Sequence, residues 1–446
     1  MTTEHNNIYS FSFYVKLAPR KILLTILMLP LMSISSALAA NPPRQPSSGP
    51  GGSDYTHRSV RSSSHGFGAL QYYIFEPDTP QPASAPLIVF THGYGGTNPM
   101  SYGAWIEHIV KKGNIVVYPK YQSMTSMIGG SRQYTSNCIK SVQDALKVLQ
   151  GSGHVKPDLD KCATVGHSYG GLLTVNIAAL AQKSGIPVPK AVMSVEPGIS
   201  ITMPLEDLSS IPPETLLLTI VGDRDTVVGN RDARKIFRLT PQIPPENKDY
   251  VLMVSDRHGT PGLSATHFAP TCMAPVGGMV SGLGNLIPSL GGSLPNLGGL
   301  GPDFGSLETD PFGPASESGG FLGAYFDNLI SYSSDTVSVM NDSINAAALS
   351  DSTADPIADL AAMPDFEFLL PVLASAGPDV SGGLTPMFGT NALDYYCTWK
   401  LFDALIDAAF FGKNREYALG NTPLQRYMGE WSDGKPVKEL VVTDNP

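Results

Sequence analysis

A serine set between glycines is the first candidate for chemistry in this sequence. The stretch TVGHSYGG covers residues 164–171, and Ser168 has a glycine two positions before it and glycines two and three positions after it. Glycines at these places permit a very sharp strand-to-helix turn, because the backbone can pass close to its neighbours. Such a turn exposes its central serine as a nucleophile. The same letters also occur by chance, so the partners of a nucleophile must be sought elsewhere.

Acyl transfer through a serine also requires a histidine base and a carboxylate that orients it. Candidates follow later apolar runs: TLLLTIVGD ends at Asp223 and is followed by Asp225, and YVLMV is followed by His258 and His267. Proximity to the strand end favours His258 over His267. Asp223 remains open as the acid, with Asp225 then capping the following helix. Glu196, after another apolar run, is a third candidate acid.

The same chemistry needs backbone N–H groups that stabilise the oxyanion of the tetrahedral intermediate. One is expected from Tyr169, the residue after the nucleophile. A second is expected from the glycine-rich stretch HGYGG at 92–96, where the N–H of Tyr94 can face the site. The alternative is that these glycines have only a structural role, in an ordinary strand-to-helix turn.

Alternating strands and helices would hold these residues at one edge of a sheet. Apolar runs predict strands over 69–77, 86–93, 114–119, 162–168, 190–197, 215–223 and 250–256. Amphipathic or apolar patterns predict helices over 101–113, 136–151, 169–185 and 394–412. This alternation predicts an α/β fold with a mainly parallel, doubly wound sheet and helices on both faces. The candidate residues all follow the carboxyl ends of strands, where the sites of such sheets lie.

The beginning of the chain has the pattern of a secretory signal peptide over residues 1–39. Lys16, Arg20 and Lys21 precede an apolar run at 22–34, and small residues at 37–39 offer a cleavage site. A membrane anchor is the alternative, but the run is shorter than the roughly 20 residues that span a bilayer. We therefore expect a secreted or periplasmic protein, with a flexible Pro/Gly/Ser-rich leader over 40–57.

Nearly all of the net negative charge lies in one internal segment. The chain of 446 residues has a formal charge of −10, and residues 273–390 hold thirteen acidic residues but no Lys or Arg. Gly, Pro, Ser and Leu dominate this segment, which predicts an insertion that is disordered or forms a lid with hydrophobic contact to lipid surfaces. The core α/β domain would comprise 58–272, with a C-terminal helix and tail of the same core at 391–446. The overall acidity argues against nucleic acid as a partner.

The four cysteines all lie beyond the predicted signal peptide. An even number in an oxidising compartment suggests disulfides, and four cysteines allow three pairings. We expect at least one bridge, with Cys272–Cys397 favoured and a local Cys138–Cys162 bridge as the other. Four buried thiols are the alternative. No Cys/His spacing resembles a zinc site.

Taken together, the motifs resemble the secreted bacterial lipase–cutinase and polyester hydrolase branch of the α/β-hydrolases. GHSYGG is similar to the nucleophile turn of that branch, HGYGG to its oxyanion loop, VGDRDTVVG to its acid motif and SATHFAP to its histidine motif. The chain order Ser, Asp, His is also the order of that fold. The resemblance implies Ser168, Asp225 and His267 as the catalytic residues, with the amides of Tyr94 and Tyr169 in the oxyanion hole.

The chain departs from that branch in two places. Polyester-cleaving members carry a tryptophan where this chain has Glu196 and Pro197, which counts against polyester substrates, and the long insertion is absent from the compact family. We expect an exported, monomeric serine hydrolase of small-molecule or lipid carboxylic esters that needs no metal or organic cofactor. A peptide or amide hydrolase of the same fold, or a non-catalytic surface binding module, are the alternatives.

Overall fold

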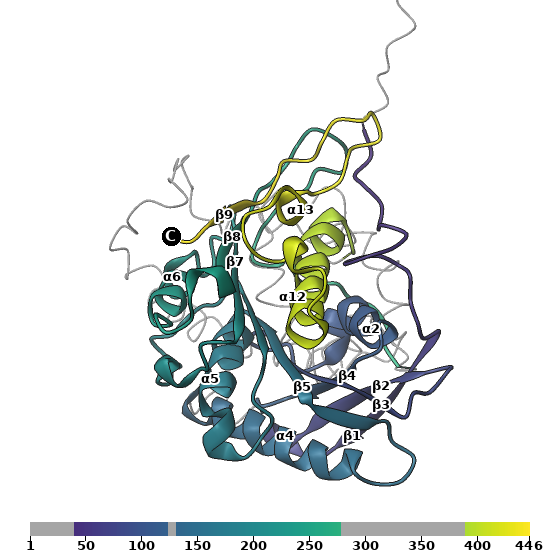
Figure 1. Ribbon diagram of the computed structural model, residues 1–446, viewed down its shortest axis with the longest axis vertical. Coiled ribbons are helices and arrows are strands. Elements are labelled where there is room, and N and C mark those ends of the chain that lie inside the picture. Colours follow the sequence, from purple (N-terminus) through teal and green to yellow (C-terminus); the bar gives the residue numbers. More distant parts are fainter. Residues whose placement is uncertain (1–39, 124–130, 278–388) are drawn as a thin grey trace, which may run out of the picture. The chain divides into compact units, whose positions relative to one another are not determined.

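A nine-stranded sheet forms the centre of the computed structural model, which describes residues 40–123, 131–277 and 389–446 (Figure 1). Its spatial order is β1-β2-β4-β3-β5-β6-β7-β8-β9. The strands are β1 (Ser59–His65), β2 (Tyr72–Asp78), β3 (Ser84–Thr91), β4 (Ile115–Pro119), β5 (Lys156–His167), β6 (Ala191–Val195), β7 (Leu216–Gly222), β8 (Lys248–Met253) and β9 (Val441–Thr443). All seven predicted strands are present, and the sequence analysis missed β1 and β9.

The six central strands are parallel, β2 and β9 pair antiparallel with β4 and β8, and β1 pairs antiparallel with β2. The predicted mainly parallel sheet is therefore confirmed. Pairing aligns the ends of three strands: His167 lies opposite Val195, and Val195 lies opposite Ile220. The residues that follow β5, β6 and β7 consequently emerge side by side at one edge.

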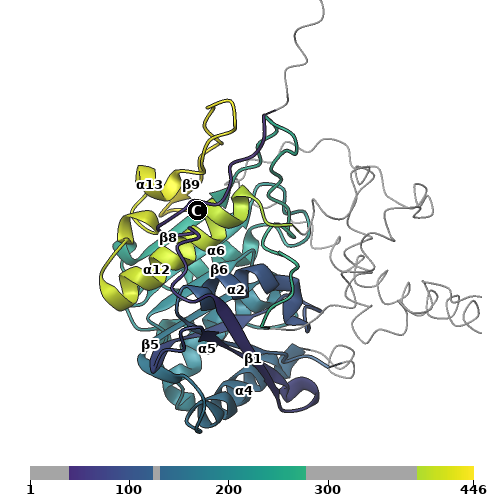
Figure 2. The ribbon, with the colours of Figure 1, turned by 90° about the vertical axis from the view of Figure 1, so that its right-hand side faces the viewer.

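Helices cover both faces of the sheet. They are α2 (Gly103–Lys111), α4 (Tyr134–Leu149), α5 (Tyr169–Ser184), α6 (Arg231–Arg238), α12 (Trp399–Phe411) and the short α13 (Pro423–Arg426). Short 3₁₀ turns lie at Gly68–Leu70, Pro99–Tyr102, Ser131–Gln133, Leu208–Ser210, Pro245–Asn247 and Arg415–Tyr417. Helices α2 and α12 pack together on one face, and α4 and α5 pack together on the other (Figure 2).

Aromatic side chains join α2 and α12 to the sheet. Trp105 on α2 lies edge-on to Phe90 of β3 and to Phe402 of α12, with ring centroids 5.2 and 6.4 Å apart. All three rings are fully buried. Large apolar surfaces of this kind contribute most of the stabilising free energy of a core. The C-terminal helix is thus part of the same core as the central strands.

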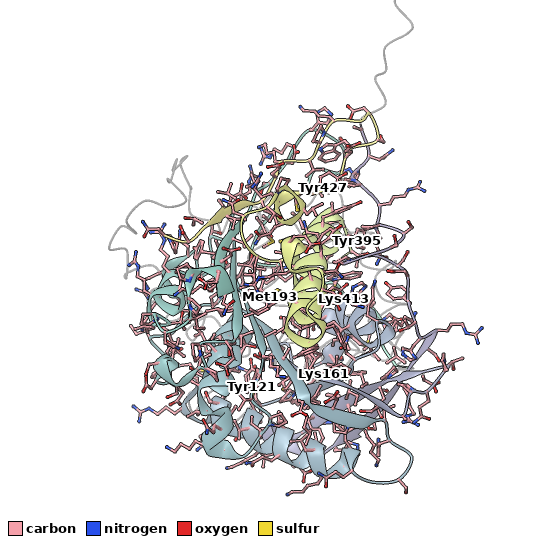
Figure 3. The ribbon with its side chains drawn as sticks, in the orientation of Figure 1. Tyr121, Lys161, Met193, Tyr395, Lys413 and Tyr427 are labelled. Atoms are coloured by element: carbon pink, nitrogen blue, oxygen red, sulfur yellow. The ribbon has the colours of Figure 1, made fainter. Side chains whose placement is uncertain are left out.

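Helix α12 follows directly on a short π-helical stretch at Asp394–Thr398. Gly412, the residue after its last one, is its C-cap and has a left-handed conformation. Figure 3 shows Tyr395 and Lys413 at opposite ends of this helical segment and Met193 of β6, a strand that α12 contacts. The predicted signal peptide and most of the predicted insertion lie outside the described residues. Within the part of the chain that is described, no helix is long and apolar enough to cross a membrane.

The predicted leader over 40–57 contains no helix or strand, yet it contacts α12. The N–H of Gly51 donates to Asp403 Oδ2 at 2.8 Å. Gly51 has a φ of +76°, and a Cβ on it would lie 2.0 Å from the carbonyl oxygen of Tyr395. This close approach explains why a glycine occupies the position.

The structure corrects the expectation of a disulfide, because all four cysteines are free, buried thiols. Cys138 on α4 and Cys162 on β5 are packing residues of the core between helix and sheet. Burial raises the pKa of all four thiols, which keeps them neutral and poorly reactive. Cysteine count alone could not distinguish such packing from cross-linking.

Candidate active site

Ser168 occupies the sharp turn that the glycine pattern predicts. It lies between the last residue of β5 and the first of α5, with φ +59° and ψ −121°. A Cβ on Gly170 would lie 2.0 Å from the carbonyl oxygen of Thr91, and one on Gly166 would lie 2.1 Å from Thr91 Oγ1. Only glycine fits at either position, so the two glycines let the turn pack against the end of β3. A strained residue held this way is typical of functional sites.

Three side chains from distant parts of the sequence form a hydrogen-bonded chain at this turn. His267 Nε2 lies 2.9 Å from Ser168 Oγ, and His267 Nδ1 lies 2.9 Å from Asp225 Oδ2. All three are buried, with exposed fractions of 5 to 8%. Asp225 Oδ1 in turn accepts hydrogen bonds from the N–H groups of Val227 and Val228. Its carboxylate is thereby fixed in orientation toward the imidazole.

Two of the competing candidates, Asp223 and His258, lie outside this hydrogen-bonded chain. Asp223 accepts hydrogen bonds from the backbone and side chain of Ser255, which ties the loop after β7 to the loop after β8. His258 is a quarter exposed and pairs with Asp433 at 2.7 Å. Nearness to the strand end therefore misled, because the chain folds back between His258 and His267 through a bridge from Asp256 to Leu263.

The glycine-rich loop after β3 passes close to the nucleophile. A Cβ on Gly93 would lie 3.3 Å from Ser168 Cβ, and the rings of Tyr94 and Tyr169 are 5.6 Å apart. The N–H of Gly93 donates to Tyr102 Oη and that of Gly95 to Gln122 Oε1, so the loop is held on both sides of Tyr94. The backbones of the two predicted oxyanion residues thus border the same serine.

Sequence reasoning missed two residues beside this chain, Tyr102 and His167. Tyr102 Oη, which accepts from Gly93, lies 2.8 Å from His167 Nδ1. His167 Nε2 lies 3.3 Å from Glu196 Oε2, and Glu196 had been considered only as an alternative acid. The one signal for His167 was its place directly before Ser168.

Burial sets the charge of this second group of residues. It raises the pKa of Glu196 well above its usual range, and the nearby charge of Asp225 acts in the same direction. Burial likewise lowers the pKa of His167 well below its usual range, with the adjacent His267 as a further cause. Burial therefore favours the neutral form of both side chains.

The ligand atoms of His167, Glu196 and His267 lie within 4.8 Å of one another, as those of a metal site would. A divalent ion bound there would need a lone pair from one ring nitrogen of His267. Nδ1 already lies at hydrogen-bond distance from Asp225, and Nε2 lies at hydrogen-bond distance from Ser168. The donor set therefore fits a hydrogen-bonded catalytic group better than a metal centre.

One comparison with known protein families bears on this geometry. The sequence model of a family described as Chlorophyllase matches residues 57–208, about a third of the chain, including Ser168 and the loop around Tyr94. The sheet order, the nucleophile turn and this match agree. The chain has an α/β-hydrolase fold. No curated protein matches the sequence of this α/β-hydrolase.

The family match also supports the hydrolysis of ester bonds as the general activity of the hydrolase. It ends before Asp225 and His267, so the roles of these residues depend on the geometry alone. The expected likeness to the lipase–cutinase branch is supported only at the level of the α/β-hydrolases. Membership of that branch stays a prediction.

Proposed function

We propose that the protein is an exported serine hydrolase that cleaves carboxylic esters through an acyl-enzyme. The observation that carries the proposal is the continuous chain from Ser168 Oγ through His267 to Asp225, with both contacts at 2.9 Å. A serine hydroxyl is a weak nucleophile alone, and an adjacent base is what activates it. The strained turn at Ser168 supports the same role, since it holds the serine at the carboxyl end of β5, next to His267.

In the first half of the reaction, Ser168 Oγ attacks the ester carbonyl carbon while its proton passes to His267 Nε2. The carbonyl π electrons move to oxygen, which gives a tetrahedral oxyanion. When the intermediate collapses, the bond to the alkoxy group breaks and the leaving alcohol takes the proton from His267. The acyl group remains on Ser168.

In the second half, water gives its proton to His267 Nε2 and its oxygen attacks the acyl carbon. Collapse returns the proton to Ser168 Oγ and releases the carboxylic acid. Asp225 accepts from His267 Nδ1–H throughout, which selects the tautomer with a free lone pair on Nε2. Its negative charge stabilises the imidazolium that forms in both steps.

The amides of Tyr94 and Tyr169 are the proposed oxyanion donors. Tyr169 is the first residue of α5, and the first N–H groups of a helix lack intrahelical acceptors. The helix N-terminus also carries a partial positive charge, which favours a developing anion. Loss of one such donor typically lowers kcat by about a hundredfold or more.

An ester substrate is favoured over a peptide by the family match, whose description names an enzyme that acts on chlorophyll. The resemblance of the motifs to lipases and cutinases supports the same class. Export rests on the signal-peptide pattern, and contact with lipid surfaces rests on the insertion. Both lie outside the described residues and remain proposals.

Hydrolysis of p-nitrophenyl esters of increasing acyl length, beside a set of peptide p-nitroanilides, tests the proposal. Purified mature protein is expected to cleave the esters and to leave the anilides uncut, and Ser168→Ala is expected to be inactive. Cleavage of the anilides at comparable kcat/KM would favour the peptide hydrolase, and no cleavage of either would favour a binding module.

A further inference from the structure

Glu196 is a buried carboxyl group that the proposed reaction does not use. It follows the last residue of β6 and is fully buried. Neither of its carboxyl oxygens has a hydrogen-bond partner among the described residues. Buried polar groups almost always have such partners, and an exception calls for a physical reason.

The backbone around Glu196 directs its side chain toward the catalytic group. Its φ is +45°, a strained value for a residue other than glycine, and its N–H donates to the carbonyl of Ile220 at 2.7 Å. Gly222 at the end of β7 supplies the room, because a Cβ there would lie 2.7 Å from Glu196 Oε1. Strain on one strand and a missing side chain on the next thus serve the same carboxyl group.

Glu196 and Asp225 reach the same imidazole atom from two adjacent strands. Glu196 Oε2 lies 3.8 Å from His267 Nδ1, whereas Asp225 Oδ2 lies 2.9 Å from it. The same oxygen, Glu196 Oε2, lies 3.3 Å from His167 Nε2. The titratable groups that surround Glu196 are Tyr102, His167, Asp225, His267 and Cys397.

We propose that Glu196 is a second positioning carboxyl group for His267, which supplies the hydrogen-bond acceptor for Nδ1 when Asp225 does not. The inference rests on the proposed function, because it concerns the same histidine. With both carboxyl groups present, Asp225 has the shorter contact and holds the imidazole. Glu196 then limits rotation of the ring away from Asp225.

The two carboxyl groups differ in charge for a physical reason. Two negative charges on one buried histidine repel each other, so one group keeps its proton. Burial and the charge of Asp225 both raise the pKa of Glu196, which makes Glu196 the neutral one. Removal of Asp225 takes away one of these causes and leaves space for Glu196 to approach Nδ1.

A double-mutant cycle on the labelling rate of Ser168 by a fluorophosphonate tests this inference. In the otherwise unchanged chain, Glu196→Met is expected to slow labelling by less than about tenfold, since Asp225 still accepts from Nδ1–H and Met has nearly the size of Glu without its acceptor oxygens. In the Asp225→Ala background, the same change is expected to slow labelling by at least about a further tenfold beyond that loss. An equal loss in both backgrounds would overturn the inference.

Glu76→Met is the matched control for loss of a buried carboxyl group. Glu76 is also almost fully buried, but it pairs with Arg61 and His154 on the opposite side of β5 from Glu196 in the strand order. It is expected to change labelling by the same factor with and without Asp225. Thermal unfolding of every variant separates a local effect from general loss of stability.

Proton NMR of the His267 Nδ1–H gives a second readout, which requires no ester substrate. In Asp225→Ala, a downfield Nδ1–H resonance is expected to persist, and in the double variant with Glu196→Met it is expected to disappear, because Met offers no carboxyl or amide oxygen to accept from Nδ1–H. Absence of the resonance already in Asp225→Ala would contradict the inference. Lack of labelling in the unchanged chain would instead refute the proposed function, and the resonance alone would then decide the role of Glu196.

Discussion

His267 Nε2 lies 2.9 Å from Ser168 Oγ although 99 residues separate them in the sequence. The contact exists because β5 and β8 are parallel strands of one sheet, with their carboxyl ends at the same edge. It gives the histidine a position from which it can take the serine proton and return it to the leaving group.

Replacement of His267 by alanine is expected to lower kcat/KM for a soluble ester by about a thousandfold or more, because the base is lost. His258→Ala is the matched control, since His258 pairs with Asp433 near the surface. We expect the control to retain most activity. Esterase assays on both variants, with circular dichroism to check folding, make the comparison. Loss of activity in His258→Ala with retention in His267→Ala would refute the assignment of the base.

Gly170→Ala is expected to impair both folding and activity, because the new Cβ would lie 2.0 Å from the carbonyl oxygen of Thr91. Overpacking of this kind costs about 1–3 kcal/mol in the free energy of unfolding. Gly185→Ala serves as the control: Gly185 has a φ of +65°, and a Cβ there would meet nothing within 4 Å. Backbone strain there costs roughly 1–2 kcal/mol, but activity should persist. Chemical denaturation and ester hydrolysis distinguish the two variants, and equal activities would count against the proposed packing of the turn.

Tyr102→Phe is expected to lower kcat by about tenfold with little change in KM. The hydroxyl accepts from the N–H of Gly93 and contacts His167 Nδ1, so its loss frees the loop that carries Tyr94. A loosened donor weakens binding of the oxyanion more than binding of the substrate. Steady-state kinetics on a short-chain ester give both parameters. A rise in KM at unchanged kcat would show that the hydroxyl serves substrate binding instead.

Asp394→Asn is expected to stabilise the protein at alkaline pH. Asp394 is fully buried, its Oδ1 has no hydrogen-bond partner in the described part of the chain, and burial raises the pKa of its carboxyl to about 8. The folded state therefore holds a proton that the unfolded state has lost, and its stabilising effect disappears as pH rises from about 4 to 8.

The amide of Asn needs no proton and still accepts from the N–H of Asn391, as Asp394 Oδ2 does. We expect the variant to gain stability relative to the unchanged chain on the order of a few kcal/mol at pH 8, with the gain shrinking toward pH 4. Urea denaturation at several pH values measures this difference. A difference that does not vary with pH would show that Asp394 keeps its ordinary pKa.

The sequence predicted those parts of the site that depend on local pattern and chain order. Ser168 was recognisable because the glycines around it are required by contacts of its own turn. His267 was not separable from His258 by strand ends, because the intervening fold-back was invisible; only the family motif favoured it. Glu196 and His167 gave no local signal of their relationship, since it arises from the register of two neighbouring strands.

The edges of the sheet and the cysteines illustrate the same limit. β1 has a polar sequence and β9 has three residues, so neither showed the apolar run of a buried parallel strand. Each is placed by pairing with one neighbouring strand. β1 pairs with β2, the next strand in the sequence, and β9 pairs with β8, which lies far earlier in the sequence. The cysteines were read by number and compartment, but their tertiary surroundings determine whether they pack or bond.

The most direct test of the proposed function is mass spectrometry of the mature protein after treatment with a fluorophosphonate. One covalent adduct per chain is expected, located by peptide mapping on Ser168, with none in Ser168→Ala or in protein denatured beforehand. Labelling should stop the hydrolysis of p-nitrophenyl esters in proportion to the adduct formed. Ester hydrolysis that continues at full rate with Ser168 completely labelled, or a folded protein that takes up no label, would refute the role of Ser168 as the nucleophile.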